Sequence, residues 1–419
     1  MRTFLFDIPA GREEFLNRIQ ENGTIGDIEL ATNIELEHIS NLNWKKIHRL
    51  SASPADIDTN IFDFRAILGS EKANIVTFNE GAMNSLPHLQ KEFSPTDTWA
   101  LSRLDNIRNK YHARYIMEKA GIPVPEYHLA TNSELPAELK FKNGQKWIAK
   151  PNFGMGGRSV RLIENIEDAQ RYLKTNALES TLYNLPQGPI NLTTYWGSGH
   201  ETIFEEYLPG LEYSAEIIVS KGQLKSFFIT RKFTSESPFF LELAHCTMPA
   251  IESEEYIAVF QQFQKILSAL ELHSTVAHLE FKMRGKQIIL IEANIRPGGG
   301  EICEIWRLAS GIDLLGAHLF GIDNEYLMPS SSAFKAHAVL HFTKLGSGLV
   351  QKDQLEQVAA ASKKFGISCN TKLLKNLTES HSPIPTESGF RYARAILSSE
   401  SFPNLIDMLE ISQQNYLVQ

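Results

Sequence analysis

The chain of 419 residues has 42% hydrophobic and 21% charged residues and a formal net charge of −8. This length and composition predict a soluble globular protein with about two to four structural units. The negative balance argues against general nucleic-acid binding, but it leaves room for a local basic pocket that binds a small anion.

Cysteine usage and apolar patterning bear on the cellular compartment. Cys246, Cys303 and Cys369 are far apart and form no CxxC pair, so neither a disulfide framework nor a zinc site is expected. The N-terminus reaches Asp7 before a signal-like apolar run develops, and no segment approaches the roughly 18 apolar residues of a membrane span. We expect a cytoplasmic protein with neither a nucleic acid nor a membrane as partner. A homodimer is left open.

The N-terminal part alternates short apolar strands with helical stretches. Strands are expected at residues 1–8, 28–31 and 73–77, and helices at 11–22 and 82–93. This alternation predicts a small parallel α/β unit. No GxGxxG motif follows the first strand, so nothing marks a dinucleotide site there.

A second unit is expected after one long helix at residues 104–119. Strands at 146–150 and 160–163 and a helix at 166–174 follow it. Residues 176–201 are polar and contain Gly and Pro, so they are predicted to form an irregular surface loop or a lid decoration.

The rest of the chain is predicted to be rich in strands. Further strands are expected at 202–208, 212–220, 223–231, 276–283 and from 288, and helices at 253–272, 301–308 and 313–320. Residues 334–419 alternate short strands and helices and lack a charged cluster that suggests chemistry.

A hairpin in this region carries polar side chains on an apolar frame. Glu292 and Asn294 end a buried strand, and Glu280 lies in the preceding arm. With a three-residue loop at 284–286, alternation places all three on one face. Cross-strand neighbours lie roughly 5–8 Å apart, a span that one or two magnesium ions could bridge. The alternative is a solvated or salt-bridged sheet face.

A glycine-rich segment, PNFGMGGRS at residues 151–159, follows an apolar strand that ends in Lys150. Its glycines expose backbone N–H groups that can cradle phosphate oxygens, and Lys150 would aim a cation at them. The GK[ST] ending of a Walker A loop is missing, and a flexible hairpin is the alternative. Lys110 and Arg114, one turn apart on a helix, could add phosphate contacts or form a solvated basic face.

Other polar residues follow strands. In FEEYLPGLE, backbone amides could pair with an adenine edge, although Glu205 and Glu206 could equally be surface charges. Arg231 and Lys232 end a strand, and His245 is better explained as a structural histidine than as a base. Arg296, next to a triple glycine, is well placed to hold a carboxylate or a transferring phosphoryl group.

In this order and spacing, the motifs NEGAM, NKYHAR with GIPVP, WIAKP with its glycine loop, EEYLPGLEYSAE, LEF and IEANIRPGGG resemble the ATP-grasp family of carboxylate–amine ligases. The resemblance covers roughly residues 73–320. It is strongest to L-amino acid ligases (dipeptide synthetases), glycinamide-ribonucleotide-synthetase-like enzymes and biotin carboxylase.

The resemblance implies a mixed α/β (α+β) ATP-grasp fold. An N-terminal parallel α/β domain would span residues 1–100, followed by a linker helix at 101–121. A lid subdomain would span 122–204, and a C-terminal catalytic domain with an antiparallel sheet would span 205–419.

The resemblance also implies roles for single residues. ATP would contact Lys110, Lys150, Gly154, Gly156, Gly157, Arg158, Ser159, Glu205, Glu206, Tyr207, Leu208 and Glu212. Two Mg²⁺ ions, with Mn²⁺ as an alternative, would be held by Glu280, Glu292 and Asn294. The substrates would meet Glu80, His245, Arg296, Gly298, Gly299 and Gly300. The expected catalytic residues are Arg296, Lys150 and Arg231.

The implied activity is ATP-dependent ligation. A small carboxylate, with an amino acid favoured, would become an acyl phosphate and then react with an amine to give an amide, ADP and phosphate. Carboxylation like that of biotin carboxylase, and a non-catalytic ATP-binding regulatory protein, are the alternatives. Arg296 beside the three expected metal ligands argues against a pure nucleotide binder.

Overall fold

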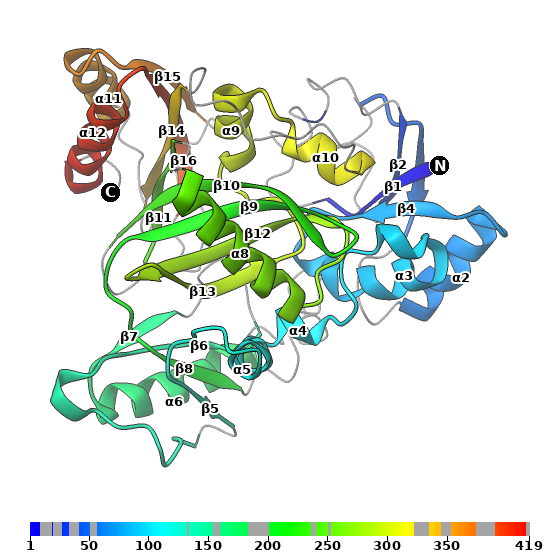
Figure 1. Ribbon diagram of the computed structural model, residues 1–419, viewed down its shortest axis with the longest axis horizontal. Coiled ribbons are helices and arrows are strands. Elements are labelled where there is room, and N and C mark those ends of the chain that lie inside the picture. Colours follow the sequence, from blue (N-terminus) through cyan, green and yellow to red (C-terminus); the bar gives the residue numbers. More distant parts are fainter. Residues whose placement is uncertain are drawn as a thin grey trace.

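In the computed structural model (Figure 1), the described residues form three β-sheets with helices packed on them. It describes residues 1–8, 19, 27–32, 42–50, 57–131, 134–153, 160–182, 201–235, 240–249, 253–321, 335–344, 353–373 and 390–415. The helix expected at 11–22 and the glycine loop at 154–159 therefore lie almost wholly outside the described residues.

The first sheet is parallel and N-terminal, as the strand–helix alternation predicts. Its strands, in spatial order, are β3 (Lys46–Arg49), β2 (Ile28–Thr32), β1 (Arg2–Phe6) and β4 (Ala73–Val76). Phe4 and Phe6 pack with α2 (Ile57–Leu68) and α3 (Leu86–Phe93) on one face. Leu5 packs toward α10 (Leu314–Phe320) on the other face, so this unit is joined to a later part of the chain.

The second sheet is antiparallel and has four strands. In spatial order they are β5 (Tyr127–Ala130), β8 (Thr202–Glu206), β6 (Trp147–Pro151) and β7 (Arg161–Ile163). Trp147 and Phe204 form its core with residues of α6 (Ile166–Leu182). Because α6 continues to Leu182, the irregular stretch expected from residue 176 is wrong at its start, and residues 183–200 lie outside the described chain.

The third sheet has eight antiparallel strands and holds most of the candidate residues. In spatial order they are β13 (Gln287–Asn294), β12 (Thr275–Arg284), β9 (Glu212–Ser220), β10 (Gln223–Thr234), β11 (Glu242–Thr247), β14 (Ala336–Lys344), β16 (Phe390–Ser399) and β15 (Ser368–Leu373). The predicted mixed α/β fold is confirmed: the described residues form one parallel and two antiparallel sheets. The domain boundaries themselves stay predictions.

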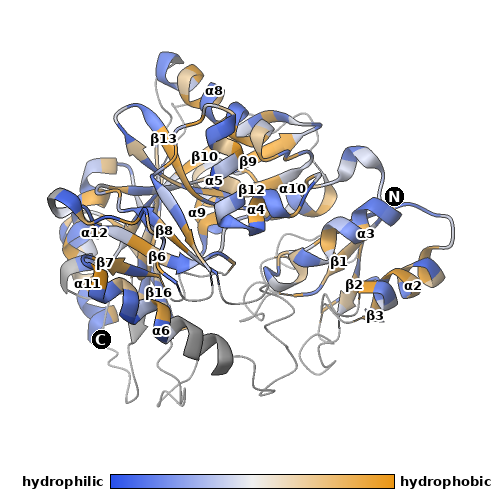
Figure 2. Cartoon of the chain, turned by 90° about the horizontal axis from the view of Figure 1, so that it is seen from below, coloured by the Kyte–Doolittle hydropathy of each residue, from blue (hydrophilic) through white to orange (hydrophobic). Residues whose placement is uncertain are grey.

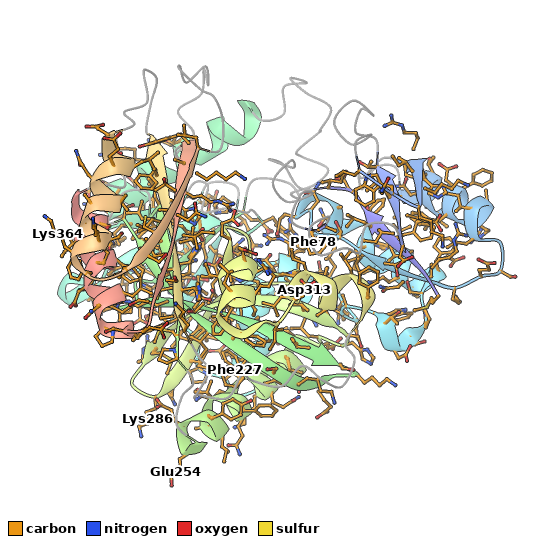
Figure 3. The ribbon with its side chains drawn as sticks, turned by 90° about the horizontal axis from the view of Figure 1, so that it is seen from above. Phe78, Phe227, Glu254, Lys286, Asp313 and Lys364 are labelled. Carbon is orange, nitrogen blue, oxygen red and sulfur yellow. The ribbon has the colours of Figure 1, made fainter. Side chains whose placement is uncertain are left out.

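Helices cover both faces of the large sheet (Figure 1). On one face, Phe227 packs against Phe263 of α8 (Ser253–Ala269), and near the C-terminus α11 (Asp353–Lys364) and α12 (Phe402–Asn415) cover β14 and β16. On the other face, Phe228 packs against Trp306 of α9 (Ile302–Ser310), which α10 (Leu314–Phe320) follows. α8 and α2 each carry hydrophilic and hydrophobic residues (Figure 2), as helices that cover a sheet on one side do. In Figure 3, Phe227 lies within the molecule, whereas the exposed Glu254 and Lys286 point outward.

The long helix expected at 104–119 is interrupted. It forms α4 (Asp105–Arg108) and α5 (Lys110–Lys119), with an extended Asn109 between them. The Asn109 side chain accepts a hydrogen bond from the His112 amide at 2.8 Å, which makes it the N-cap of α5. The break places Lys110 at the first turn of α5, where its amide donates to the carbonyl of Asn152 at 3.2 Å.

Candidate functional site

The hairpin of β12 and β13 places two carboxylates directly opposite each other. Arg284 pairs with Gln287, so the turn between the strands has two residues and not the three expected. An unbroken ladder from this turn would set Glu280 against Ile291. The register instead skips Ile291, and this bulge brings Glu280 opposite Glu292. The prediction of a shared face is confirmed, but its cause is the bulge.

Cations surround this carboxylate pair. Glu280 lies 2.9 Å from the Lys232 ammonium and 3.2 Å from His278 Nε2, and Glu292 lies 3.7 Å from the Lys110 ammonium. Burial disfavours the Glu280 carboxylate, but Lys232 and His278 outweigh it and lower its pKa to about 2. The Glu280 carboxylate is therefore charged at neutral pH.

The donor set fits a divalent cation in kind. Carboxylate and amide oxygens are the ligands that magnesium prefers, and Asn294 lies two residues beyond Glu292 on the same face. Within the described residues, no group of three or more His, Cys, Asp or Glu side chains is arranged to hold a metal. This candidate set has two carboxylates only. Oriented with its nitrogen toward Glu80, the Asn294 amide donates to that carboxylate at 2.8 Å.

Lys232 is central to the site, although the sequence predicted no role for it. Its ammonium lies 2.8 Å from Glu212, 3.0 Å from Glu242 and 2.9 Å from Glu280. Burial lowers the pKa of Lys232, but the three carboxylates outweigh it and raise the pKa well above its usual value. The Lys232 charge thus holds together side chains from β9, β11 and β12.

The sequence pointed to the neighbouring Arg231 instead, and the structure does not bring Arg231 to this group. Successive side chains of a strand point to opposite faces, so Arg231 faces α12, where it pairs with Glu410 at 2.8 Å. Its guanidinium also lies over the Phe233 ring, 4.4 Å from the centroid. The cross-strand partner of Glu212 is Lys232, and only this register distinguishes the two cations.

The end of β6 presents a second charged group. Lys150 lies 2.7 Å from Glu205, which also contacts Arg114 at 3.0 Å. Burial lowers the pKa of the Lys150 ammonium, and Arg114 and Lys150 together keep the pKa of Glu205 below its usual value despite burial. Arg114 is almost fully buried and also donates to the Ile291 carbonyl at 2.5 Å. It therefore ties α5 both to β8 and to the bulge of β13.

The segment expected to contact the nucleotide base lies beside this group. The Tyr207 amide donates to the Lys146 carbonyl at 2.9 Å, and the Leu208 carbonyl accepts from the Lys282 ammonium at 2.8 Å. Glu206 is more exposed and pairs with Arg284 at 2.8 Å. Tyr207 and Leu208 thus hold the chain that connects the second sheet to the third.

Glu80 links the N-terminal unit to the end of β13. It follows β4 at the start of the short 3₁₀ helix η4 (Gly81–Asn84) and is buried. It pairs with Arg108 and with Arg296, whose Nη2 lies 2.7 Å away. Burial opposes the charge, but Arg296 and Arg108 keep the pKa of Glu80 below its usual value. Arg108 belongs to this cluster and was not singled out in the sequence.

The triple glycine meets a buried acid–base pair. The Gly298 amide donates to Glu216 Oε2 at 2.7 Å, and Glu216 Oε1 lies 2.5 Å from His278 Nδ1. Burial disfavours the imidazolium, yet Glu216 and Glu280 raise the pKa of His278 to about 10. Gly299 has no neighbour within 4 Å of a hypothetical Cβ, and the Gly300 carbonyl lies 3.1 Å from His245 Nδ1. The triple-glycine loop, Gly298 to Gly300, therefore lies against β9, β11 and β12.

Five predicted phosphate-binding residues lie outside the described residues. They are Gly154, Gly156, Gly157, Arg158 and Ser159. The base of their loop is described: Asn152 is buried, accepts from the Tyr111 amide at 2.8 Å and donates to Glu201 at 2.7 Å. Asn152 thus fixes the chain before the loop to α5 and to the start of β8.

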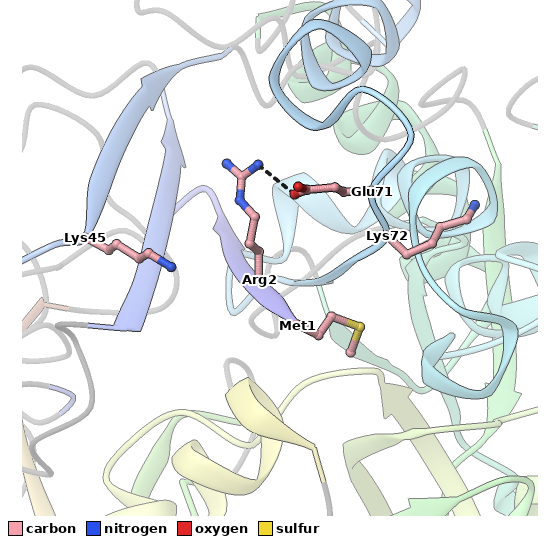
Figure 4. Close-up of a pocket in the computed structure, with 5 residues that line it drawn as sticks. All are labelled: Met1, Arg2, Lys45, Glu71 and Lys72. Carbon is pink, nitrogen blue, oxygen red and sulfur yellow. Dashed lines mark ion pairs between the residues drawn. The ribbon is translucent and has the colours of Figure 1, made fainter.

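A surface cavity of about 440 Å³ lies elsewhere, at the N-terminal ends of strands of the first sheet (Figure 4). It is lined by Met1, Arg2, Lys45, Glu71 and Lys72. Arg2 is already paired with Glu29 at 2.7 Å and with Glu71 at 3.5 Å. No lining residue belongs to the predicted site. In the described part of the chain, no helix combines the length and apolar character of a membrane span.

Comparison with known proteins relates part of this chain to a known domain. Residues 144–304 match the model of the ATP-grasp domain. Uncharacterized protein y4rH from Sinorhizobium fredii is 29% identical over 224 residues, which are 52% of this chain and 42% of that protein. Carnosine synthase 1 from Gallus gallus is 25% identical over 187 residues, which are 44% of this chain and 20% of that protein. The matches thus cover less than half the length of these curated relatives.

A solved structure covers the whole chain. L-amino acid ligase from Bacillus licheniformis aligns with a TM-score of 0.73 and 17% identity, over 100% of this chain and 98% of that chain. At this identity the likeness concerns the fold. Together with the matching family model, it shows that the chain contains an ATP-grasp domain at residues 144–304 and has the ATP-grasp fold.

Proposed function

We propose that the protein is an ATP-dependent ligase that activates a small carboxylate as an acyl phosphate and joins it to an amine. The observation that carries the proposal is the end of β13. There the opposed carboxylates Glu280 and Glu292 are followed by Arg296, which is paired with Glu80. One hairpin thus combines ligands for a cation with a guanidinium for an anion.

Lys110 and Lys150 are suited to the phosphates of ATP. Both ammonium groups are buried and now face carboxylates, Glu292 at 3.7 Å and Glu205 at 2.7 Å. Phosphate oxygens are anionic acceptors of the same kind, so they could share these partners without leaving a buried charge unbalanced. Glu206 to Leu208 and Glu212 would then lie along the base and the ribose.

Glu280, Glu292 and Asn294 would hold magnesium, and Glu280 would keep Lys232 as its second partner. A bound divalent cation would offset the repulsion between the triphosphate and an attacking carboxylate. The number and identity of such ions are part of the proposal.

The buried pair of Glu80 and Arg296 supports an amino acid as the activated carboxylate. Their opposite charges, 2.7 Å apart, match the ammonium and carboxylate groups of such a zwitterion. The names of one structural neighbour, L-amino acid ligase, and of the carnosine synthases among the curated relatives support the same substrate class.

The reaction would have two steps. A carboxylate oxygen attacks the γ-phosphorus, the bond to the β-phosphate oxygen breaks, and ADP leaves. The amine nitrogen then attacks the acyl carbon, the bond to the phosphate oxygen breaks, and phosphate and one proton are released. Arg296 is placed to stabilise charge on the acyl phosphate in both steps.

Phosphate release from ATP and Mg²⁺, measured across a panel of amino-acid pairs, tests the proposal. At least one pair is expected to raise release above the ATP-only background, with a peptide product visible by mass spectrometry. Arg296→Ala should abolish the increase and leave ADP binding in place. The control Arg65→Ala, at an exposed arginine of α2, should retain it.

Two results would contradict the proposal. Release that depends on bicarbonate and produces a carboxylated product would favour carboxylation. ADP binding without release for any carboxylate would favour a regulatory nucleotide binder.

A further inference from the structure

The triple-glycine loop ends in two consecutive residues with left-handed backbone. Gly300 has φ +57°, and Glu301 has φ +67° with ψ +8°. Glycine adopts this conformation freely, whereas a glutamate resists it because its Cβ crowds the backbone. Glu301 also begins α9, since its carbonyl accepts from the Ile305 amide at 3.0 Å. Contacts from the surrounding structure must therefore hold Glu301 in place.

Side chains from the C-terminal strands hold this turn. Glu301 Oε1 lies 2.5 Å from Nη1 of Arg394 on β16, and the two residues are only 7% and 9% exposed. His341 of β14 is the cross-strand partner of Arg394, so both point to the same face of the sheet. His341 Nε2 lies 3.4 Å from Nδ1 of His245, the nitrogen that also approaches the Gly300 carbonyl.

We propose that Arg394 is a positioning residue for the acceptor end of the active site. Through Glu301 it fixes the left-handed turn at the end of the triple-glycine loop, and so sets the affinity for the attacking amine. This inference rests on the proposed ligase function. It assigns part of the site to β14 and β16, strands for which the sequence predicts no role.

The geometry separates this effect from nucleotide binding. Lys110, Lys150 and the hairpin carboxylates come from α5, β6, β12 and β13. The Arg394–Glu301 pair instead meets the loop at its last residues, after Gly298 and Gly299. A disturbance there should move the acceptor pocket and leave the ATP subsite in place.

Residue 301 offers a decisive pair of substitutions. Glu301→Gln keeps the crowded backbone and loses the ion pair, whereas Glu301→Gly loses the ion pair and relieves the crowding. The double variant Glu301→Gly/Arg394→Gln also removes the buried Arg394 cation, which would otherwise have lost its Glu301 partner. Lys335→Gln is a matched control, because Lys335 pairs with Glu400 at 2.9 Å across the outer ends of the same two strands.

The variants are compared by the apparent KM for the amine, the apparent KM for ATP and the Kd of Mg·ADP. Glu301→Gln and Arg394→Gln should each raise the amine KM at least tenfold, with ATP KM and ADP affinity within about twofold of wild type. The double variant Glu301→Gly/Arg394→Gln should return the amine KM to within about threefold. The same Arg394→Gln change would thus be harmful beside glutamate and harmless beside glycine.

Hydrogen exchange tests the turn without turnover. Amides 298–302 should exchange at least tenfold faster in Glu301→Gln and Arg394→Gln than in wild type or the double variant. Equal exchange in all of them would overturn the inference whether or not the protein is active. In an active protein, a double variant as impaired as Arg394→Gln, or parallel changes in amine and ATP KM, would overturn it as well. Absence of any ligase turnover in the wild type would instead count against the proposed function.

Discussion

Gly298 has less room than any ordinary side chain needs. A Cβ built on Gly298 would lie 2.7 Å from Glu216 Oε1 and 2.7 Å from His278 Nδ1, whereas ordinary contacts begin at 3.4 Å. Gly298→Ala therefore requires a shift of at least 0.3 Å, and one of 0.7 Å to reach ordinary van der Waals contact. Glu216 and His278 are buried and bound to each other at 2.5 Å, so neither can swing away alone.

The free-energy cost of the substitution depends on which of these contacts moves. Movement of the loop would stretch the bond from the Gly298 amide to Glu216, and a hydrogen bond to a charged group contributes about 1.5–3 kcal/mol. Overpacking in a rigid environment costs about 1–3 kcal/mol. Since one response relieves part of the other, we expect a loss of about 3 kcal/mol in the free energy of unfolding.

Thermal unfolding of three proteins in parallel measures this loss. Gly298→Ala should lower Tm by about 3 °C in a chain of this size. Gly299→Ala is the control, because nothing lies within 4 Å of its Cβ, and its Tm should stay within about 1 °C. Equal Tm values for the two variants would refute the reasoning, because they share the loop and differ only in the space available.

Three further predictions concern other parts of the molecule. Lys232→Met should lower the free energy of unfolding by about 3–5 kcal/mol, since Glu212, Glu242 and Glu280 lose their shared cation; a Tm equal to wild type would contradict this. Burial lowers the pKa of His318 to about 4. In the unfolded chain this histidine has its usual pKa near 6.5, so the unfolded state takes up the proton first as pH falls. About 3 kcal/mol of the free energy of unfolding, present above pH 6.5, should therefore be lost as pH falls to 4. In denaturant titrations His318→Gln should flatten that slope, and an unchanged slope would assign it to other groups. EDTA should abolish ATP-dependent phosphate release, and excess Mg²⁺ should restore it. Glu292→Gln should raise the Mg²⁺ concentration for half-maximal release about tenfold. An unchanged Mg²⁺ concentration for half-maximal release would show that Glu292 is not a metal ligand.

The sequence predicted the architecture where periodicity was strong. The strand–helix alternation of the first sheet and the apolar frame of the hairpin were both visible, because they depend on local patterns of burial. By contrast, β3 and α2 come from a stretch without clear periodicity. The break at Asn109 carried a visible signal, since asparagine is a preferred N-cap and competes with the helix backbone.

The faces of strands were harder to predict than the strands. Glu280 and Glu292 share a face because a bulge compensates a turn that is one residue shorter than expected. Arg231 and Lys232 are adjacent, and only the register with β9 shows which of them meets Glu212. The pair of Glu301 and Arg394 joins distant segments, so no local pattern could indicate it.

The large sheet limits how this chain can be shortened. β11 is an internal strand, bonded to β10 on one side and to β14 on the other. A fragment that ended after α10 would contain every site residue that the sequence predicted, but it would leave the outer edge of β11 with unpaired backbone groups. Such an edge recruits other chains. We therefore expect that fragment to aggregate on expression, and a soluble minimal version to need β14 and β16.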